Sequence, residues 1–175
     1  TITELADLVT TNSSQTNVLC RTASTGVAVV GVAGGNGTYT YTWSHDASNN
    51  TATASNLAAG TYTVSVVDGL GCADDGDITF TITQPATVVS SSSTQTNVNC
   101  YGGSTGAIDL TPAGGTEANA YGYAWVATNN GTVPNNQSTI EDLTTLTAGT
   151  YTCTITDDNG CTTTEAVTIT QLADL

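Results

Sequence analysis

The sequence repeats itself, and this repeat limits the possible folds more than any other feature. The segment TNVLC at residues 16–20 returns as TNVNC at residues 96–100, 80 positions later. Three further segments recur: YTYTW at 39–43 as YGYAW at 121–125, AGTY at 59–62 and 148–151, and GC at 71–72 and 160–161. The offset grows to 82 because two residues are inserted before residue 121, and to 89 because the second copy is longer around residues 129–139. Insertions of this kind belong in turns, so we expect two copies of one small fold.

The repeat also predicts where the modules begin and end. TITELADL at residues 1–8 is nearly the same as TITQLADL at residues 168–175. Residues 1–8 are therefore predicted to be the last strand and linker of a preceding module. We expect one module at residues 9–85 and another at 86–175, which ends in the start of the next linker. The parent chain would then be longer and would cycle through two-module units.

Alternation of apolar and polar residues predicts short β-strands in both modules. Ala28 and Val30 should face inward, as should Ile108 and Leu110 in the second copy. Three other sets share a face within their strand: Tyr39, Tyr41 and Trp43; Tyr62, Val64 and Val66; Phe80 and Ile82. Thr, Ser, Asn and Gly are abundant, Met is absent, and no segment has the composition of a long helix. The sequence therefore predicts an all-β fold of two tandem Ig-like β-sandwich modules, each with about seven strands.

The charge of the chain excludes several classes of partner. Fifteen acidic residues stand against one basic residue, Arg21, which gives a formal net charge of -14. Nucleic-acid binding and attraction to anionic membranes both depend on Lys and Arg, so we expect neither nucleic acid nor direct membrane insertion. The single histidine, His45, follows a predicted strand and has no counterpart in the second module. A catalytic triad has no basis here, and we expect no enzyme.

The five cysteines predict disulfides in an oxidising compartment. Cys20 and Cys72 occupy the same places in the first module as Cys100 and Cys161 in the second. We expect each module to be closed by its own disulfide, Cys20 with Cys72 and Cys100 with Cys161; the alternative is reduced, buried thiols. Cys153 replaces Val64 of the first module, which favours a free, buried thiol over an intermolecular link.

Acidic and amide side chains gather around the two Gly-Cys segments, and they permit two interpretations. Oxygen ligands at short spacing in a glycine-containing loop suit Ca²⁺, so calcium is a possible cofactor. The other interpretation is turn chemistry, because Asp and Asn cap β-turns through their own side chains. The candidate ligands are Asp68, Asp74, Asp75 and Asp77 in the first module, and Asp157, Asp158 and Asn159 in the second.

The two tryptophans also permit two interpretations. Exposed aromatic rings stack on sugars, which would make Trp43 and Trp125 part of a glycan site. Each shares a face with two tyrosines or their equivalents, and the pattern occurs in both modules. This favours a role in the sandwich core, like the buried tryptophan of Ig domains.

The order of motifs resembles the SprB-type repeat of gliding-motility adhesins. Each module contains a Cys, then Ser-Thr-Gly, Gly-Gly, Tyr-x-Tyr-x-Trp, Ala-Gly-Thr-Tyr-Thr, Asp-x-x-Gly-Cys and a closing Thr-Ile-Thr-Gln, with small variations. The resemblance covers residues 9–85 and 88–171. It departs where RTA at 21–23 replaces the more typical YGG at 101–103, and where Leu172 replaces Pro85. The resemblance implies a very large cell-surface protein of a gliding bacterium, exported by type IX secretion.

Two functions remain open at this point. The first is a structural and adhesive segment of a long extracellular surface filament or adhesin, which attaches cells to surfaces or to one another. Its partners would be further modules of the same chain and copies of itself in a fibre. The alternative is an Ig-like module that binds a glycan or protein on a target cell through the variable loops at residues 44–56 and 126–142.

Overall fold

The computed structural model describes residues 5–74, 76–116 and 120–174. All its named elements are strands, which confirms the all-β prediction. The chain divides into two compact units, Thr1–Gln84 and Pro85–Leu175, and the predicted boundary after residue 85 lies one residue away. In the described part of the chain, no helix has the length and apolarity needed to cross a membrane.

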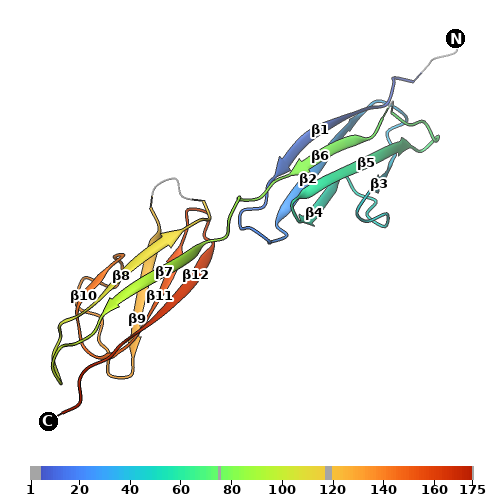
Figure 1. Cartoon of the computed structure of the whole chain (residues 1–175). Helices are drawn as coiled ribbons and strands as arrows, with labels where there is room; N and C mark the ends of the chain where they lie inside the picture. Colours follow the sequence, from blue (N-terminus) through green and yellow to red (C-terminus); the bar gives the residue numbers. More distant parts are fainter. Residues whose placement is uncertain (1–4, 75, 117–119, 175) are drawn as a thin grey trace. The chain divides into compact units, whose positions relative to one another are not determined.

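Each unit is a sandwich of two three-stranded antiparallel sheets (Figure 1). In the first module, β1, β2 and β4 form one sheet and β3, β5 and β6 the other. Its strands are β1 (Val9–Thr16), β2 (Gly26–Ala33), β3 (Tyr39–Trp43), β4 (Thr53–Leu57), β5 (Gly60–Asp68) and β6 (Ile78–Ile82). The second module repeats this arrangement with β7-β8-β10 and β9-β11-β12. Its strands are β7 (Ser90–Thr96), β8 (Gly106–Ala113), β9 (Gly122–Thr128), β10 (Leu143–Leu146), β11 (Gly149–Thr156) and β12 (Thr162–Ile169).

The strand order is that of an Ig sandwich with one strand fewer. Ig domains place strands A, B and E in one sheet and C, F and G in the other, with D beside E. Among the described residues, each module has six strands, which match A, B, C, E, F and G in order. The Ig-like prediction is therefore confirmed, and the estimate of about seven strands was too high for this part of the chain. In the first module, side chains fold the β3–β4 connection into turns: the Asp46 carboxylate accepts a hydrogen bond from the Ser48 N–H (2.9 Å), and Asn50 accepts one from Tyr41 (2.7 Å).

The predicted inward residues form the two cores. Ala28, Val30, Ile108 and Leu110 are all buried. Trp43 is 1% exposed and packs against Phe80, with 5.7 Å between ring centroids. Both tryptophans use the indole N–H inside their own module. Trp43 donates to the carbonyl of Thr51 and Trp125 to that of Ile140, each at 2.9 Å. These rings belong to the core and leave no face open for a sugar.

One tyrosine in each module anchors a backbone turn, a role that was not foreseen from the sequence. Tyr62 donates its hydroxyl to the carbonyl of Ala58 (3.0 Å), and Tyr151 donates to that of Thr147 (2.9 Å). This is the tyrosine corner of Ig-type sandwiches, in which a tyrosine early in strand F ties down the preceding turn. The repeated Ala-Gly-Thr-Tyr segment was the available signal.

Candidate functional site

The clearest shared feature outside the cores is the turn that ends in cysteine, here called the Gly-Cys turn: residues 68–72 in the first module and 157–161 in the second. It connects β5 to β6, and β11 to β12. The Asp68 N–H donates to the carbonyl of Cys72 (2.8 Å), and the Gly71 N–H donates to that of Asp68 (2.9 Å). Gly71 has a φ of 85°, a left-handed conformation that only glycine adopts without strain. The Asp-x-x-Gly-Cys spacing is thus required by the turn itself.

The Asp68 carboxylate is the hydrogen-bond acceptor around which this turn folds. Asp68 is 3% exposed. Its Oδ1 accepts the backbone N–H groups of Leu70 and Cys72, both at 2.9 Å, and its Oδ2 accepts that of Asn36 at 3.2 Å. The hydrogen bond from Cys72 is the largest influence lowering the pKa of Asp68 below its ordinary value, and burial works against it. The carboxylate therefore stays ionised and ties two loops together.

Asp157 has the same role in the second module. It is 5% exposed, and its Oδ1 accepts the N–H groups of Asn159 (3.0 Å) and Cys161 (2.8 Å). Its Oδ2 accepts the N–H of Thr116 (2.8 Å), which lies in the loop matching that of Asn36. The repetition of three backbone hydrogen bonds in both modules favours turn capping as the role of this aspartate.

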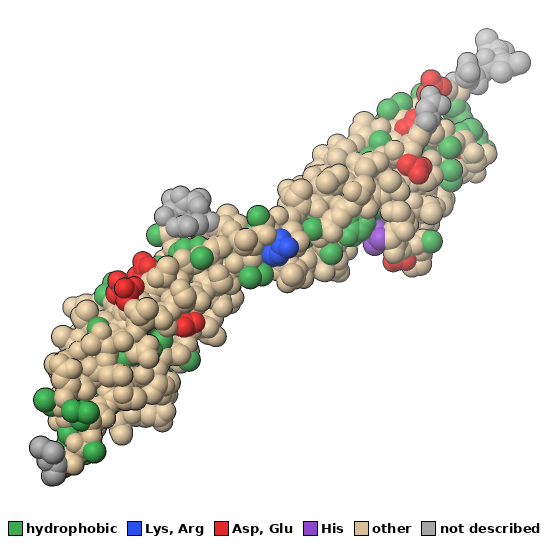
Figure 2. All heavy atoms as spheres, in the orientation of Figure 1, with side chains coloured by type: hydrophobic (Ala, Val, Ile, Leu, Met, Phe, Trp, Pro, Cys, Tyr) green, Lys and Arg blue, Asp and Glu red, His purple; other side chains and the backbone are tan. Residues whose placement is uncertain are grey.

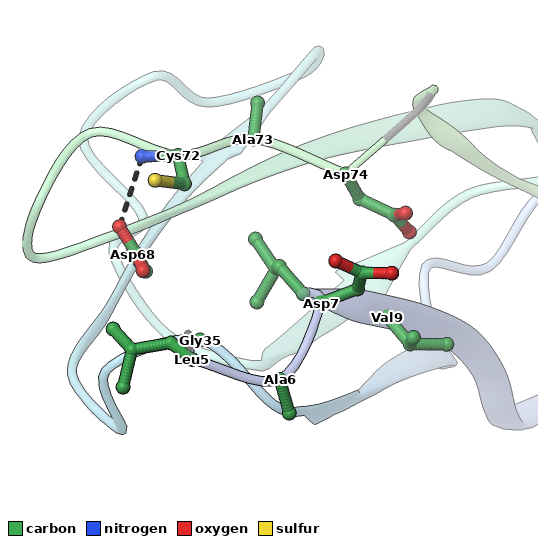
Figure 3. A pocket seen from close by; sticks show the side chains of 10 residues that line it. Leu5, Ala6, Asp7, Val9, Gly35, Asp68, Cys72, Ala73 and Asp74 are labelled. Atoms are coloured by element: carbon green, nitrogen blue, oxygen red, sulfur yellow. Dashed lines mark hydrogen bonds between the residues drawn. The ribbon is translucent and has the colours of Figure 1, made fainter. Parts of the chain in front are cut away.

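A cavity of about 590 Å³ lies beside the Gly-Cys turn of the first module (Figure 3). Residues 5–8 form one wall, and Cys72, Ala73 and Asp74 form another. The segment 5–8 is held there by a hydrogen bond from the Gly35 N–H to the Ala6 carbonyl (2.8 Å) and by burial of Leu8, which is 7% exposed. Asp74 is half-buried, and its Oδ2 accepts the backbone N–H of Thr10 (2.8 Å) and the Thr10 hydroxyl.

The predicted calcium ligands are only partly brought together. Asp77 and Asp158 are exposed, and Asp75 lies outside the described residues. Asn159 directs its amide nitrogen to the Thr116 hydroxyl (3.0 Å). The described residues contain no group of three or more His, Cys, Asp or Glu side chains that could hold a metal ion. Calcium binding therefore stays a prediction, and Asp68 and Asp157 each already accept hydrogen bonds from three backbone N–H groups.

The predicted cysteine pairing was wrong. Cys72 and Cys100 are free and exposed, whereas Cys20 and Cys161 are disulfide-bonded. Neither Cys20–Cys72 nor Cys100–Cys161 forms, so no disulfide closes a module on itself. The reason lies in the strand directions: Cys20 follows β1 and Cys72 follows β5, and these strands end at opposite ends of the sandwich. A disulfide needs Cα atoms about 4.4–6.8 Å apart, and a strand of eight residues such as β1 spans about 25 Å.

Cys153 is free and 0% exposed, in the second module's core. It lies opposite Trp125 in the β9–β11 pairing, as Val64 lies opposite Trp43 in the β3–β5 pairing. Burial raises the pKa of its thiol, which keeps it protonated and unreactive.

His45 packs its ring edge-on against aromatic neighbours in the first module. Its centroid lies 6.0 Å from that of Trp43 and 5.2 Å from that of Tyr62. These contacts account for its position at the end of β3 by packing alone.

Comparison with known families finds one match in each module. The model of the SprB repeat matches residues 12–48 and 92–133. Each module thus contains a segment similar to the SprB repeat. The matches include the cysteine after the first strand, the Gly-Gly turn and the tryptophan of each copy. No curated protein matches the chain in sequence.

Solved structures similar to the chain are Ig-domain proteins. They include the N-terminal eight Ig domains of Down Syndrome Cell Adhesion Molecule isoform 1.30.30 (13% identity, TM-score 0.42), which the chain matches over 97% of its own length and 25% of theirs. Sidekick-1 immunoglobulin domains 1–5 match at 8% identity and TM-score 0.41, over 97% of this chain and 40% of that one. Drosophila OTK extracellular domains 3–5 match at 17% identity and TM-score 0.38, over 84% and 56%. The chain thus spans a quarter to about half of these proteins, and TM-scores this low carry no weight beside the strand order.

Proposed function

We propose that this chain is a structural and adhesive segment of a long extracellular filament or adhesin on a bacterial surface. It would attach cells to surfaces or to one another, and copies of it would associate in a fibre. The observation that carries the proposal is that a segment similar to the SprB repeat occurs in each of two modules with the same sandwich fold, and that the modules agree down to the hydrogen bonds of their Gly-Cys turns. Export by type IX secretion and a part in gliding motility are proposed on the family resemblance alone.

The use of the polar side chains supports a scaffold. Asp68 and Asp157 cap turns, Tyr62 and Tyr151 anchor corners, and the indole of Trp43 is hydrogen-bonded within the core. No buried side-chain nitrogen or oxygen lacks a hydrogen-bond partner among the described residues. A module whose polar groups are satisfied internally gains stability from them and keeps its surface for contacts with neighbours.

The charge predicts how copies would associate. The net charge is -14, and the face in Figure 2 shows acidic groups separated by wide uncharged areas. Parallel chains of this charge repel one another at low ionic strength, and salt screens that repulsion within about 10 Å at 0.1 M. We expect association to increase with salt. Analytical ultracentrifugation from 10 mM to 500 mM NaCl measures this, and a sedimentation coefficient independent of salt contradicts the fibre part of the proposal.

The extracellular role is tested on cells that produce the protein. Antibodies against the purified chain should label extracellular filaments or the cell surface in immunoelectron microscopy of intact cells. Fab fragments of the same antibodies should reduce attachment to glass or to other cells. Label found only after permeabilisation overturns the proposal, and surface label without any effect of Fab on attachment overturns its adhesive part.

A second candidate function uses the connection between β9 and β10 as a binding loop. Val126 is 61% exposed on β9, and Ile140 is 45% exposed on the connection, which gives this region apolar contact area. Deleting the loop is a poor test, because it would remove two hydrogen bonds that hold Trp125 in the core. The indole N–H of Trp125 donates to the carbonyl of Ile140, and its backbone N–H donates to the carbonyl of Ser138. The variant with Val126→Thr and Ile140→Thr keeps those carbonyls. Loss of attachment in this variant, with unchanged thermal stability, would favour the binding-loop function over the scaffold.

Calcium is the remaining proposal from the sequence. If the acidic residues in and after the Gly-Cys turns bind Ca²⁺, titration calorimetry should show saturable binding that Mg²⁺ does not reproduce. The Asp74→Asn variant should weaken it, whereas Asp109→Asn on the exposed side of β8 should not. No heat at millimolar Ca²⁺ removes calcium from the proposed function.

A further inference from the structure

Each module presents one cysteine at each of its ends. The proximal end is defined here as the end where the chain enters the module, and the distal end as the end where it leaves. Cys20 is distal, because the Val18 N–H next to it donates to the carbonyl of Thr83 (2.9 Å), just after the last strand. Cys72 is proximal, because it shares a cavity with residues 5–8, just before the first strand.

The second module has the same arrangement. Cys100 is distal, since the Val98 N–H donates to the Thr170 carbonyl (2.9 Å) and the Gly102 N–H donates to the Gln171 side chain (2.9 Å). Cys161 is proximal, in the Gly-Cys turn capped by Asp157. The two free cysteines outside the cores, Cys100 and Cys72, are thus one distal and one proximal cysteine.

The repeated segment Leu-Ala-Asp-Leu relates the two free cysteines. Where it occurs at residues 5–8, it lines the cavity that contains Cys72. Where it occurs at residues 172–175, its described part lines a cavity of about 450 Å³ together with Cys100. One copy of the segment therefore lies beside a distal cysteine and the other beside a proximal one. A single copy placed between two consecutive modules would have both cysteines beside it.

Exposed apolar side chains accompany both free thiols. Tyr101, next to Cys100, is 58% exposed, and Leu172 in the same cavity is 65% exposed. At the proximal end of the first module, Leu70 in the Gly-Cys turn is 69% exposed and Leu5 is 55% exposed. Apolar surface of this kind at a module end suits contact with another module of the same family.

We propose that consecutive SprB modules are joined by a disulfide between the distal cysteine of one module and the proximal cysteine of the next. Cys100 would pair with the Gly-Cys cysteine of a following module of the same kind, and Cys72 with the distal cysteine of a preceding one. Each bond forms when two thiols lose two electrons and two protons to a disulfide oxidant, such as oxidised glutathione, which is reduced to two thiols.

The consequence is a second covalent path across every junction. The backbone linker is one path, and the disulfide runs beside it from module to module. A chain without Lys has no Lys-Asn isopeptide bond to reinforce it, so disulfides at the junctions would carry tension and limit bending there. This inference concerns the junctions alone and holds whether or not the chain is adhesive.

The test is a tandem protein in which residues 1–167 are followed by the full chain, so that the natural Leu-Ala-Asp-Leu segment forms the new junction. After folding with oxidised and reduced glutathione, free thiols are alkylated and the protein is digested with Asp-N protease and chymotrypsin, since Arg21 is the only trypsin site. Mass spectrometry without reduction should find Cys100 of the first copy linked to Cys72 of the second. Cys100→Ser in the first copy should leave that Cys72 alkylated, with an unchanged circular dichroism spectrum.

Three results would overturn the proposal. The first is alkylation of both Cys100 and the following Cys72 in the folded, oxidised tandem. The second is linkage of either cysteine within its own module. The third is linkage between separate molecules, seen as a dimer in non-reducing size-exclusion chromatography at low protein concentration. The Cys153→Val variant is the matched control, because it removes a thiol that takes no part and should leave the linkage unchanged.

Discussion

Replacing Asp157 by Asn tests whether one carboxylate holds the Gly-Cys turn. The two Oδ1 hydrogen bonds, from Asn159 and Cys161, can be kept by the amide oxygen of an asparagine. The Oδ2 bond from Thr116 cannot, because the amide NH₂ group then faces the Thr116 N–H and two donors oppose each other.

The structure sets the size of the effect. A hydrogen bond to a charged group contributes about 1.5–3 kcal/mol, and leaving a buried N–H without an acceptor costs a similar amount. Asp157→Asn should therefore destabilise the second module by about 2–3 kcal/mol. For a module of this size that corresponds to a fall in Tm of roughly 10 °C or more.

Hydrogen-exchange mass spectrometry in increasing urea measures the stability of the second module, because it follows β8 and β11 separately from the strands of the first module. The first module should be unchanged and serves as an internal reference. Asp109→Asn is the control, since it removes one negative charge from an exposed position of the same module. If Asp157→Asn exchanges like Asp109→Asn, the carboxylate does not hold the turn and the argument fails.

Three further predictions concern acidity, packing and the tyrosine corner. The pKa of Asp68 is lowered, so the carboxylate stabilises the first module fully above about pH 4, and this stabilisation is lost as the pH falls through the lowered pKa. Asp68→Asn should therefore lower the unfolding temperature of the first module at pH 7. The same variant should show a smaller drop in unfolding temperature below pH 4 than the unchanged protein. Cys153→Val should change the free energy of unfolding by less than about 1 kcal/mol, because Val64 fills the matching site of the first module. Cys153→Ser should lower it by about 1–3 kcal/mol, because it buries a hydroxyl group. Equal effects of the two variants in urea titrations would contradict this prediction. Tyr151→Phe should lower the free energy of unfolding by about 1–3 kcal/mol, and Tyr62→Phe by less, because Tyr151 is fully buried and Tyr62 is partly exposed. Amide hydrogen exchange at the two tyrosine corners measures the difference.

Much of the fold could be predicted because successive side chains of a strand lie on alternate faces, and this alternation can be seen in the sequence itself. Val30 and Leu110 alternate with more polar neighbours, and in a half-buried strand the apolar set must face inward. Trp43 shares that parity with Tyr41, and the structure places its ring in the core. The described residues form no seventh strand in either module. This could not be predicted, because it depends on whether side chains such as Asp46 and Asn50 fold a connection into turns.

The candidate site was harder to predict because its residues act across the fold. Asp68 looked like a metal ligand beside other carboxylates, and only the structure shows that its second oxygen accepts the N–H of Asn36, 32 positions away. Nothing in the local sequence distinguishes a carboxylate that accepts hydrogen bonds from two loops from one that binds a metal ion. The repeat of the same aspartate in both modules indicated importance without indicating which role.

The sequence alone determined that the chain holds two copies of one β-sandwich, because a repeat and the parity of its strands are visible residue by residue. It also located four of the five cysteines at matching positions in the two copies. Only the tertiary structure decided which cysteines can meet. Cys20 and Cys72 belong to one module, yet β1 and β5 end at opposite ends of it, and no disulfide spans the length of a strand. Two cysteines of the same module can therefore lie far apart in space, because each antiparallel strand carries the chain from one end of the module to the other.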